Sequence, residues 1–377
     1  MRLTIPLAIL MFSLLAAAQT ISFEEYDPPS SLVVPEHPVT AARYPFVDVH
    51  NHQWNIPGQD LKRLTAQMDS LNMAVMVNLS GRSFRRDTLP DGTVRFKPLG
   101  SDFLKRSVER VREEIPGRVI TFTNVEFDSV GAPGWIDAAV AGIRRDAANG
   151  AAGLKIYKNL GMEVVDIAGE RVPVDDPRLD PIWAVCGELG LPVLIHTADP
   201  HQFWLPHDAQ NERWLELKER PGRKRIPGED PAFETLLAEQ HHVFEKHPGT
   251  DFINAHLGWL GNDLARLAAL LDRFPNVYTE IGAVLAELGR QPRFARQFFI
   301  DYQDRILFGK DAWTPAEYHV YFRVLETADE YFPYYRRRHA FWRMYGMDLP
   351  DAVLKKVYYQ NALRIIPGID RSLFPEN

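Results

Sequence analysis

Short β-rich runs alternate with helical patterns along nearly the whole chain, and this order strongly limits the folds open to it. Strands are expected to begin near Phe46, Met73, Val119, Gly153, Pro192, Asp251, Asn276 and Ile306. Helical periodicity is expected over residues 61–71, 103–115, 135–148, 179–189, 233–244, 264–274, 294–302 and 352–366. Eight strand–helix units in 377 residues predict an α/β protein, a (β/α)8 TIM barrel in one catalytic domain with loop insertions. A doubly wound parallel sheet is the alternative.

The first residues have the pattern of an export signal. Met1 and Arg2 precede an apolar stretch over residues 3–15, and small residues come just before Gln19. This pattern predicts a signal peptide over residues 1–18 and a periplasmic or secreted protein, with an uncleaved anchor as the alternative. The apolar run is short for a bilayer span, which takes about 20 residues. No stable membrane span is expected after cleavage.

The rest of the chain divides into an arm, a barrel and a tail. Residues 19–43 are rich in proline and aperiodic, which predicts an extended arm before a barrel over 44–367 and a C-terminal tail over 368–377. An insertion at Pro200–Asp230 follows the fifth strand and is a candidate lid, because loops after barrel strands build the catalytic face. A second insertion at Tyr331–Pro350 is expected to pack outside the barrel or to form a contact in a homo-oligomer.

Composition excludes some classes of function. The formal net charge is −7 and no basic stretch dominates, which argues against nucleic acid as a partner. Cys186 is the only cysteine, so no intrachain disulfide can form. Because Cys186 lies in an apolar helical stretch, we interpret it as part of the core and not as a nucleophile.

Side chains that can bind a metal stand at the carboxyl ends of four expected strands. The first strand ends in His50-Asn51-His52, and the fifth, sixth and eighth end near His196, His256 and Asp311. In a barrel these ends open at the same mouth, and neutral imidazoles suit Zn²⁺ or a similar ion. Each histidine alone fits a hydrogen-bonded core residue better, and Asp311 alone fits a helix cap. Together they predict a divalent metal site.

Lys155 adds a charged group to the fourth strand. If Leu154 and Ile156 pack outward, Lys155 and Tyr157 face the barrel lumen, and Lys158 points outward into solvent. A buried lysine is costly unless it is paired or modified. Three roles stay open: a carbamylated bridge between two metal ions, an ammonium that orients an anionic substrate, or a side chain that reaches solvent.

Taken together, these motifs resemble the amidohydrolase superfamily, and more closely its amidohydrolase-related group. That group includes aminocarboxymuconate-semialdehyde decarboxylase, resorcylate decarboxylase and pyrone-dicarboxylate lactonase. The resemblance covers roughly residues 44–367 and includes the segments 254–258, 309–311 and 358–362. It implies a TIM barrel that holds one divalent ion, usually Zn²⁺, with a second ion left open.

The resemblance also implies roles for single residues. The expected ligands are His50, His52, His196 and Asp311. His256 would bind a second ion or, in one-metal members, polarise the substrate. The chain departs from the group at Lys310, where Thr or Ser is more frequent. By alternation Lys310 faces away from Asp311, so little effect on metal binding is expected. One-metal members commonly lack a lysine like Lys155, which leaves the metal count open.

The leading hypothesis is a metal-dependent hydrolase in which a metal-activated water attacks a small carbonyl compound, such as a carboxylated lactone, ester or amide. Asp311 would take a proton from the water and pass it to the leaving group, while His256 polarises the carbonyl oxygen. Residues on mouth loops are expected to bind an anionic, planar substrate: Arg82, Arg85 and Arg86 at a carboxylate, and Trp54 and Trp204 by stacking.

Two other functions remain as alternatives. A non-oxidative decarboxylase of a small aromatic or unsaturated carboxylic acid would use the same ion. A metal-binding protein without turnover belongs to another class. The presence of both Asp311 and His256 argues against that class, because a structural zinc site is closed by four protein ligands and needs no acid–base partner.

Overall fold

The computed structural model describes residues 21–88, 94–337 and 339–376. The described residues 21–33 belong to a small unit of their own, and residues from Val34 onward form the second unit, which carries the fold. The predicted signal peptide over 1–18 lies outside the described residues. In the described residues, no helix has the length and apolar character needed to cross a membrane.

Parallel strands form the centre of the second unit. Within the described ranges, one eight-stranded sheet has the order β1-β2-β5-β6-β7-β8-β9-β10. These strands are β1 Phe46–Asn51, β2 Met73–Asn78, β5 Val119–Asn124, β6 Ala151–Ile156, β7 Val193–Ile195, β8 Phe252–Asn254, β9 Val277–Glu280 and β10 Ile306–Leu307. All eight lie at the positions expected from the sequence.

The last strand returns to the first, so the sheet is a nearly closed barrel. Val49 N donates to Phe308 O at 2.9 Å, and Asp311 N donates to His50 O at 2.6 Å. An open doubly wound sheet would leave its first and last strands apart as edges. The TIM-barrel prediction is therefore confirmed.

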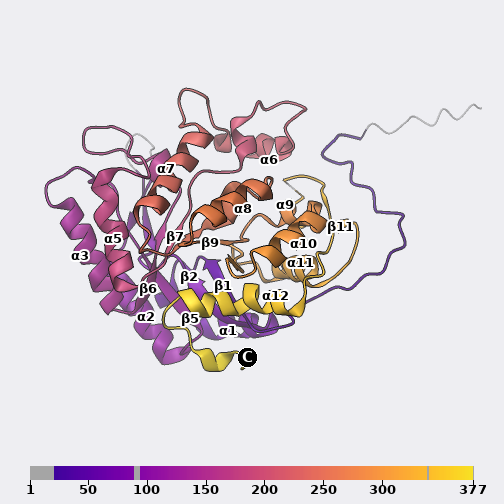
Figure 1. Cartoon of the computed structure of the whole chain (residues 1–377), viewed down its shortest axis with the longest axis horizontal. Coiled ribbons are helices and arrows are strands. Elements are labelled where there is room, and N and C mark those ends of the chain that lie inside the picture. The colour runs from indigo at the N-terminus through magenta and orange to yellow at the C-terminus, as the bar shows by residue number, and fades with distance from the viewer. Residues whose placement is uncertain (1–20, 89–93, 338, 377) are drawn as a thin grey trace, which may run out of the picture. The chain divides into compact units, whose positions relative to one another are not determined.

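Helices separate the strands and surround them (Figure 1). The longer ones are α1 Leu61–Ser70, α2 Ser101–Glu114, α3 Trp135–Ala148, α5 Asp180–Leu189, α7 Phe233–Lys246, α8 Leu264–Arg273, α10 Pro292–Asp301 and α11 Pro315–Glu326. The closing helix is α12 Asp351–Lys355, which continues through a π-helical turn, Lys356–Gln360, into α13 Asn361–Ile365. Every residue of β1 and β6 is buried, as expected for parallel strands covered on both faces.

Sequence patterns missed several elements, among them a long helix and a hairpin. Helix α11 escaped notice because it buries aromatic side chains, Tyr318, Tyr321 and Phe322, in place of a regular aliphatic stripe. The second is an antiparallel hairpin after β2, formed by β3 Phe84–Thr88 and β4 Val94–Pro98. Arg85 and Arg86 therefore lie on a strand and not on an irregular loop.

The two predicted insertions contact each other. The first insertion contains the helix α6 Trp214–Glu219, and the Arg213 guanidinium next to it lies 5.6 Å from the centre of the Trp342 ring in the second insertion. Arg213 also pairs with Glu287 on the short helix α9 Leu285–Arg290, and both side chains are buried. The second insertion thus packs on the first. Whether the first acts as a lid stays a prediction.

The segments before and after the predicted barrel domain contact the domain through specific side chains. In the predicted arm, His37 Nδ1 lies 2.6 Å from Asp329 Oδ1. In the predicted tail, the Phe374 ring stacks on Tyr359 at 5.2 Å. Cys186 is fully buried, and burial raises the pKa of its thiol to about 12, which fits the predicted core role.

Candidate active site

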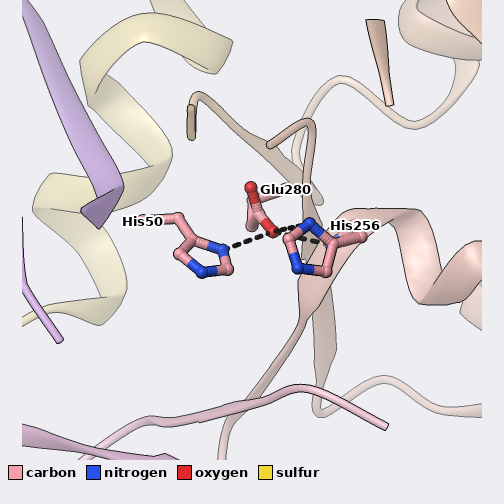
Figure 2. A group of neighbouring side chains, drawn as sticks. All are labelled: His50, His256 and Glu280. Carbon is pink, nitrogen blue, oxygen red and sulfur yellow. Dashed lines mark hydrogen bonds and ion pairs between the residues drawn. The ribbon is translucent and has the colours of Figure 1, made fainter. Parts of the chain in front are cut away.

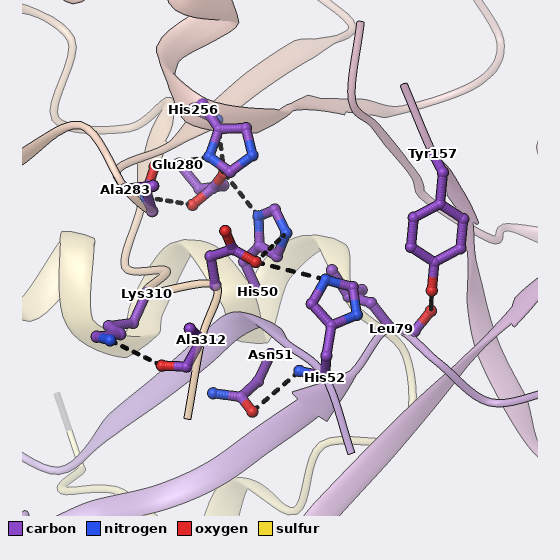
Figure 3. Close-up of polar contacts among 12 residues, drawn as sticks. His50, Asn51, His52, Leu79, Tyr157, His256, Glu280, Ala283, Lys310 and Ala312 are labelled. Atoms are coloured by element: carbon purple, nitrogen blue, oxygen red, sulfur yellow. Dashed lines mark hydrogen bonds and ion pairs between the residues drawn. The ribbon is translucent and has the colours of Figure 1, made fainter. Parts of the chain in front are cut away.

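Three of the predicted metal ligands converge at the barrel mouth. The Nε2 atoms of His50 and His52 lie 3.6 and 3.5 Å from the same oxygen, Oδ1 of Asp311. The centres of the two histidine rings are 5.4 Å apart (Figure 3). Ligand atoms of these three side chains all lie within 4.8 Å of one another, and each residue is buried or half-buried. Zn²⁺ binds nitrogen and oxygen ligands at about 2.0–2.2 Å, so an ion between these atoms is geometrically suitable.

A residue that sequence analysis missed, Glu280 at the end of β9, holds His50 in place. His50 Nδ1 donates to Glu280 Oε1 at 2.9 Å, and the backbone N–H of His256 donates to the same oxygen at 2.6 Å (Figure 2). Gly282 N donates to the other carboxylate oxygen at 2.5 Å. Because a carboxylate only accepts, the His50 proton sits on Nδ1 and the lone pair of Nε2 points toward Asp311.

A chain of hydrogen bonds fixes His52 in the same tautomer. The Tyr157 hydroxyl donates to Leu79 O at 3.1 Å. Ser80 Oγ, 3.1 Å from the Tyr157 oxygen, must therefore donate to it, and His52 Nδ1 donates to Ser80 Oγ at 2.7 Å. Nε2 of His52 is left with a lone pair, as a metal ligand requires.

Burial puts these groups in the protonation states that bind metal. Desolvation lowers the pKa of His50 well below its usual value and that of His52 to about 4, so both rings are neutral at pH 7. Burial opposes ionisation of Asp311, but the neighbouring imidazoles and Lys155 outweigh it and lower the pKa of the carboxyl. The donor set of two neutral imidazoles and one carboxylate fits a divalent ion.

His256 stands on a strained turn after β8. Non-glycine residues His256, Leu257 and Trp259 have φ values of 58°, 54° and 54°, in the left-handed region. His256 Nδ1 donates to Gly282 O at 2.7 Å, and the Trp259 ring stacks on the imidazole at 4.6 Å. The ring is therefore fixed, with Nε2 as its remaining nitrogen.

His196, at the end of β7, lies beside His256 and outside the group of three. The two ring centres are 4.4 Å apart. In the described part of the chain, Nε2 of His196 is buried and has no hydrogen-bond partner. Buried nitrogens are normally satisfied, so this one fits a ligand position that the protein leaves open. A metal-ligand role for His196 stays a prediction.

Lys155 is a second buried group without a partner. Its side chain is 1% exposed, and no hydrogen bond to Nζ occurs among the described residues. The ammonium lies 5.5 Å from the centre of the Tyr157 ring. Burial lowers the pKa of Lys155 to about 8, against the opposing pull of Asp311 and Glu280. An inward-facing cation is therefore present near the ligands, as alternation along β6 predicts.

Asp48 is a second buried carboxyl group beside the predicted ligands that the sequence did not reveal. Its Oδ1 accepts the backbone N–H groups of His50 and Lys310, each at 3.1 Å, and its Oδ2 accepts the Tyr318 hydroxyl at 2.6 Å. Burial raises the pKa of Asp48 to about 6. This carboxyl joins the end of β1 to the turn that carries Asp311. Lys310 pairs with Glu317, so it faces away from Asp311 as expected.

A cavity of about 940 Å³ adjoins the ligands on the side of His52. Its lining includes Trp54, Phe84 and Tyr157. The Trp54 ring stacks on the His52 imidazole with centres 5.1 Å apart and planes 8° apart. Trp54 is thus at the mouth, where a planar substrate was expected to stack.

The remaining predicted substrate residues have other surroundings. Arg82 Nε donates to the buried Asp146 of α3 at 2.6 Å. Trp204 Nε1 donates to Pro231 O at 2.9 Å, and its ring packs on Phe233 at the start of α7. Arg85 is exposed on β3 and is not part of the cavity lining. Substrate contacts by Arg82, Arg85 and Trp204 stay predictions.

Replacing Glu280 tests whether this carboxylate positions the ligands. Glu280→Gln places an amide N–H₂ against N–H donors, so His50 loses its orientation. Partners of this kind are worth about 10- to 100-fold in metal affinity. Competition with a coloured chelator should show a Zn²⁺ affinity weaker by that factor. Glu326→Gln, a buried carboxylate that accepts from the Tyr358 hydroxyl, is the matched control and should keep wild-type affinity. Equal affinity in both variants would contradict the assignment.

Comparison with known proteins supports the fold and identifies a family. The amidohydrolase family model matches residues 47–368. An uncharacterised TIM-barrel protein from Bordetella bronchiseptica is 15% identical, with a TM-score of 0.51 over 85% of this chain and 97% of its own. An amidohydrolase from Staphylococcus aureus, described as putative in its name, is 13% identical, with a TM-score of 0.51 over 85% and 99%.

A third solved structure, 2,6-dihydroxybenzoate decarboxylase from Rhizobium, is 15% identical with a TM-score of 0.47, over 85% of this chain and 98% of its own. No curated protein sequence matches this chain. Likeness at these identities shows the fold alone, whereas the family model covers most of the chain. The protein therefore belongs to the amidohydrolase family.

Proposed function

We propose that this protein is a divalent-metal-dependent hydrolase that acts on small carbonyl compounds. The observation that carries the proposal is the approach of the His50 and His52 Nε2 atoms to one oxygen of Asp311, at 3.6 and 3.5 Å. Hydrogen bonds to the opposite ring nitrogens fix both tautomers for ligation. His50, His52 and Asp311 would hold the ion, and His196 is the fourth proposed ligand.

A bound divalent ion supplies Lewis-acid chemistry, because it lowers the pKa of a nearby water and polarises a carbonyl oxygen. Zinc is the proposed ion, since it favours imidazole and carboxylate ligands. Asp311 is ionised at neutral pH because its pKa lies below the ordinary value. We assign it the proton from the attacking water, which it then returns to the leaving group as a general acid.

His256 and Lys155 complete the proposed site. His256 donates from Nδ1 to Gly282 O, so Nε2 accepts a proton when the ring is neutral and donates to a carbonyl oxygen when the ring is protonated. Lys155 carries a positive charge below about pH 8 and has no hydrogen-bond partner among the described residues. It is suited to orient a carboxylate or the oxygen of a polarised carbonyl.

A decarboxylase is the second candidate, and Lys155 is the observation that favours it. A substrate carboxylate next to a buried, unpartnered ammonium would be the reacting group of such an enzyme. A metal-binding protein without turnover is less well supported. His50, His52 and Asp311 alone would leave coordination positions open, and with His196 as a fourth ligand an ion that expands to five-coordinate would still hold a water. A cavity of about 940 Å³ on the side of His52 gives a substrate access.

Metal removal and ligand replacement test the proposal together. Purified protein is expected to contain about one divalent ion per chain, following the open-site pattern of catalytic zinc. The double variant His50→Ala, His52→Ala should bind no metal and show no turnover. The matched control is His241→Ala with His242→Ala, two histidines on α7, which should keep both.

Turnover is measured with a panel of lactones, esters, amides and aromatic acids, following acid release against CO₂ release. Acid release that stops on chelation supports the hydrolase, and CO₂ release supports the decarboxylase. Full activity of the double variant after chelation would contradict both.

Replacing Lys155 separates its possible roles. If it is an ammonium, Lys155→Ala should keep the metal and lower kcat/KM for an anionic substrate about ten- to a hundredfold, because a charge-assisted hydrogen bond is worth about 1.5–3 kcal/mol. The pKa of Lys155 near 8 gives the direction of the pH dependence, because the ammonium charge is present below pH 8 and lost above it. Wild-type kcat/KM should therefore fall as pH rises through 8, and the variant should lack this limb.

The carbamate role predicts a different result for the same variant. Bound metal would fall by about one equivalent, and a small carboxylic acid would partly restore it. Lys246→Ala, an exposed lysine at the end of α7, is the control and should change neither readout. Unchanged metal content together with unchanged kinetics in Lys155→Ala would reject both functional roles.

A further inference from the structure

An aromatic wall leads outward from the predicted ligand His52 into the cavity. Trp54 stacks on the His52 ring at 5.1 Å, and the Tyr157 ring lies 5.8 Å from it. Phe84 meets Tyr157 edge-on at 5.3 Å, and Phe127 continues the lining. A ligand that reaches the ion from this cavity must pass along ring faces, which attract flat groups and cations.

The outer lining of the same cavity is acidic. It includes Asp128, Glu163 and Asp166 together with Lys158. Lys158 Nζ lies 2.5 Å from Asp199, which also pairs with Arg225, and Arg225 lies 3.7 Å from Asp230, so these two cations face two carboxylates. Asp166 lies 2.8 Å from Arg178 and is compensated by it. Across the described ranges, the side chains of Asp128 and Glu163 make no ion pair or hydrogen bond. The charge left uncompensated at the outer end is therefore negative.

A positive charge, Lys155, lies behind the aromatic lining. Lys155 is 1% exposed, its Nζ has no hydrogen-bond partner among the described residues, and it lies over the ring of Tyr157, a cavity-lining residue. A divalent ion at His50, His52 and Asp311 would add to that positive charge. Positive charge thus lies behind the aromatic lining, next to Tyr157, while the exposed part of the lining carries negative charge.

We propose that the substrate is a small dipolar molecule, with a carbonyl or carboxylate group at the metal end and an ammonium group at the other. The ammonium group would lie against the aromatic wall and near Asp128 and Glu163. This inference rests on the proposed function and deepens it by naming the substrate class. The anionic group expected of the substrate would then be confined to the end that meets the metal. A second anionic group at the other end would be repelled by the carboxylates of Asp128 and Glu163.

The test uses benzohydroxamate, whose hydroxamate group chelates zinc and whose ring can stack on Trp54. Para substituents probe the outer end: ω-aminoalkyl tails of one to three carbons, the neutral ω-hydroxyalkyl tails of equal length, and a carboxylate. Dissociation constants are measured by calorimetry on the full, zinc-loaded protein and on chelated protein. The best aminoalkyl compound is expected to bind about five- to twentyfold more tightly than its hydroxyalkyl match, from one exposed ion pair and one cation–π contact.

Variants of Asp128 and Glu163 test whether these two carboxylates cause the preference for the ammonium tail. Asp128→Asn with Glu163→Gln should remove most of the preference for the ammonium tail and leave the affinity for the hydroxyalkyl compound unchanged. Both residues are exposed, so the fold should tolerate the changes. Glu113→Gln, an exposed acid at the far end of α2, is the control and should keep the preference. High salt should weaken the preference in the wild type, because exposed charges are screened.

The outcomes distinguish this inference from the proposed function. If benzohydroxamate binds only the zinc-loaded protein but the three kinds of tail bind equally, or the carboxylate tail binds best, the dipolar substrate is rejected and the metal site stands. If benzohydroxamate binds zinc-loaded and chelated protein alike, the proposed metal site fails and this inference fails with it. An ammonium preference that survives in the Asp128→Asn, Glu163→Gln variant also overturns the assignment.

Discussion

The arrangement of the site depends on the hydrogen bonds that the buried carboxylate of Glu280 accepts. This carboxylate accepts hydrogen bonds from Nδ1–H of His50 on β1, from the backbone N–H of His256 after β8, and from the backbone N–H of Gly282 after β9. Three strand ends are thereby fixed around one charged group. The backbone has made room for it, since a Cβ atom at Gly309 would collide with Oε2 of Glu280. Burying a carboxylate is costly unless donors surround it, and these N–H groups provide them.

The direction of the hydrogen bonds then determines the chemistry. Nδ1 of His50 donates a hydrogen bond to Glu280, and Nδ1 of His52 donates one to the Ser80–Tyr157–Leu79 chain. Both Nε2 lone pairs therefore face Asp311. Asp48 ties the turn of Asp311 to β1 from the other side. The protein alone therefore holds the predicted ligands in one orientation, as a preformed metal site would require.

Much of the fold was predictable from local patterns. Strand positions followed from short apolar runs, and the shared mouth of a barrel brought His50, His52 and Asp311 together although the last of them is far away in the sequence. Glu280 and Asp48 were not predictable in the same way, because a single acid near a strand end has no characteristic spacing and its partners come from other strands. The pairing of Arg82 with Asp146 depends on how α3 packs, which no local pattern records. The predicted signal peptide stays a prediction.

Anomalous diffraction from crystals of the zinc-loaded protein, measured at the zinc absorption edge, tests the central claim most directly. We expect one strong anomalous peak, which marks a zinc ion about 2.0–2.2 Å from Nε2 of His50, from Nε2 of His52 and from a carboxylate oxygen of Asp311. The Nδ1 atom of His50 should still be bonded to Glu280. An ion bound through Nδ1 of either histidine, or zinc found only away from these three side chains, would contradict it.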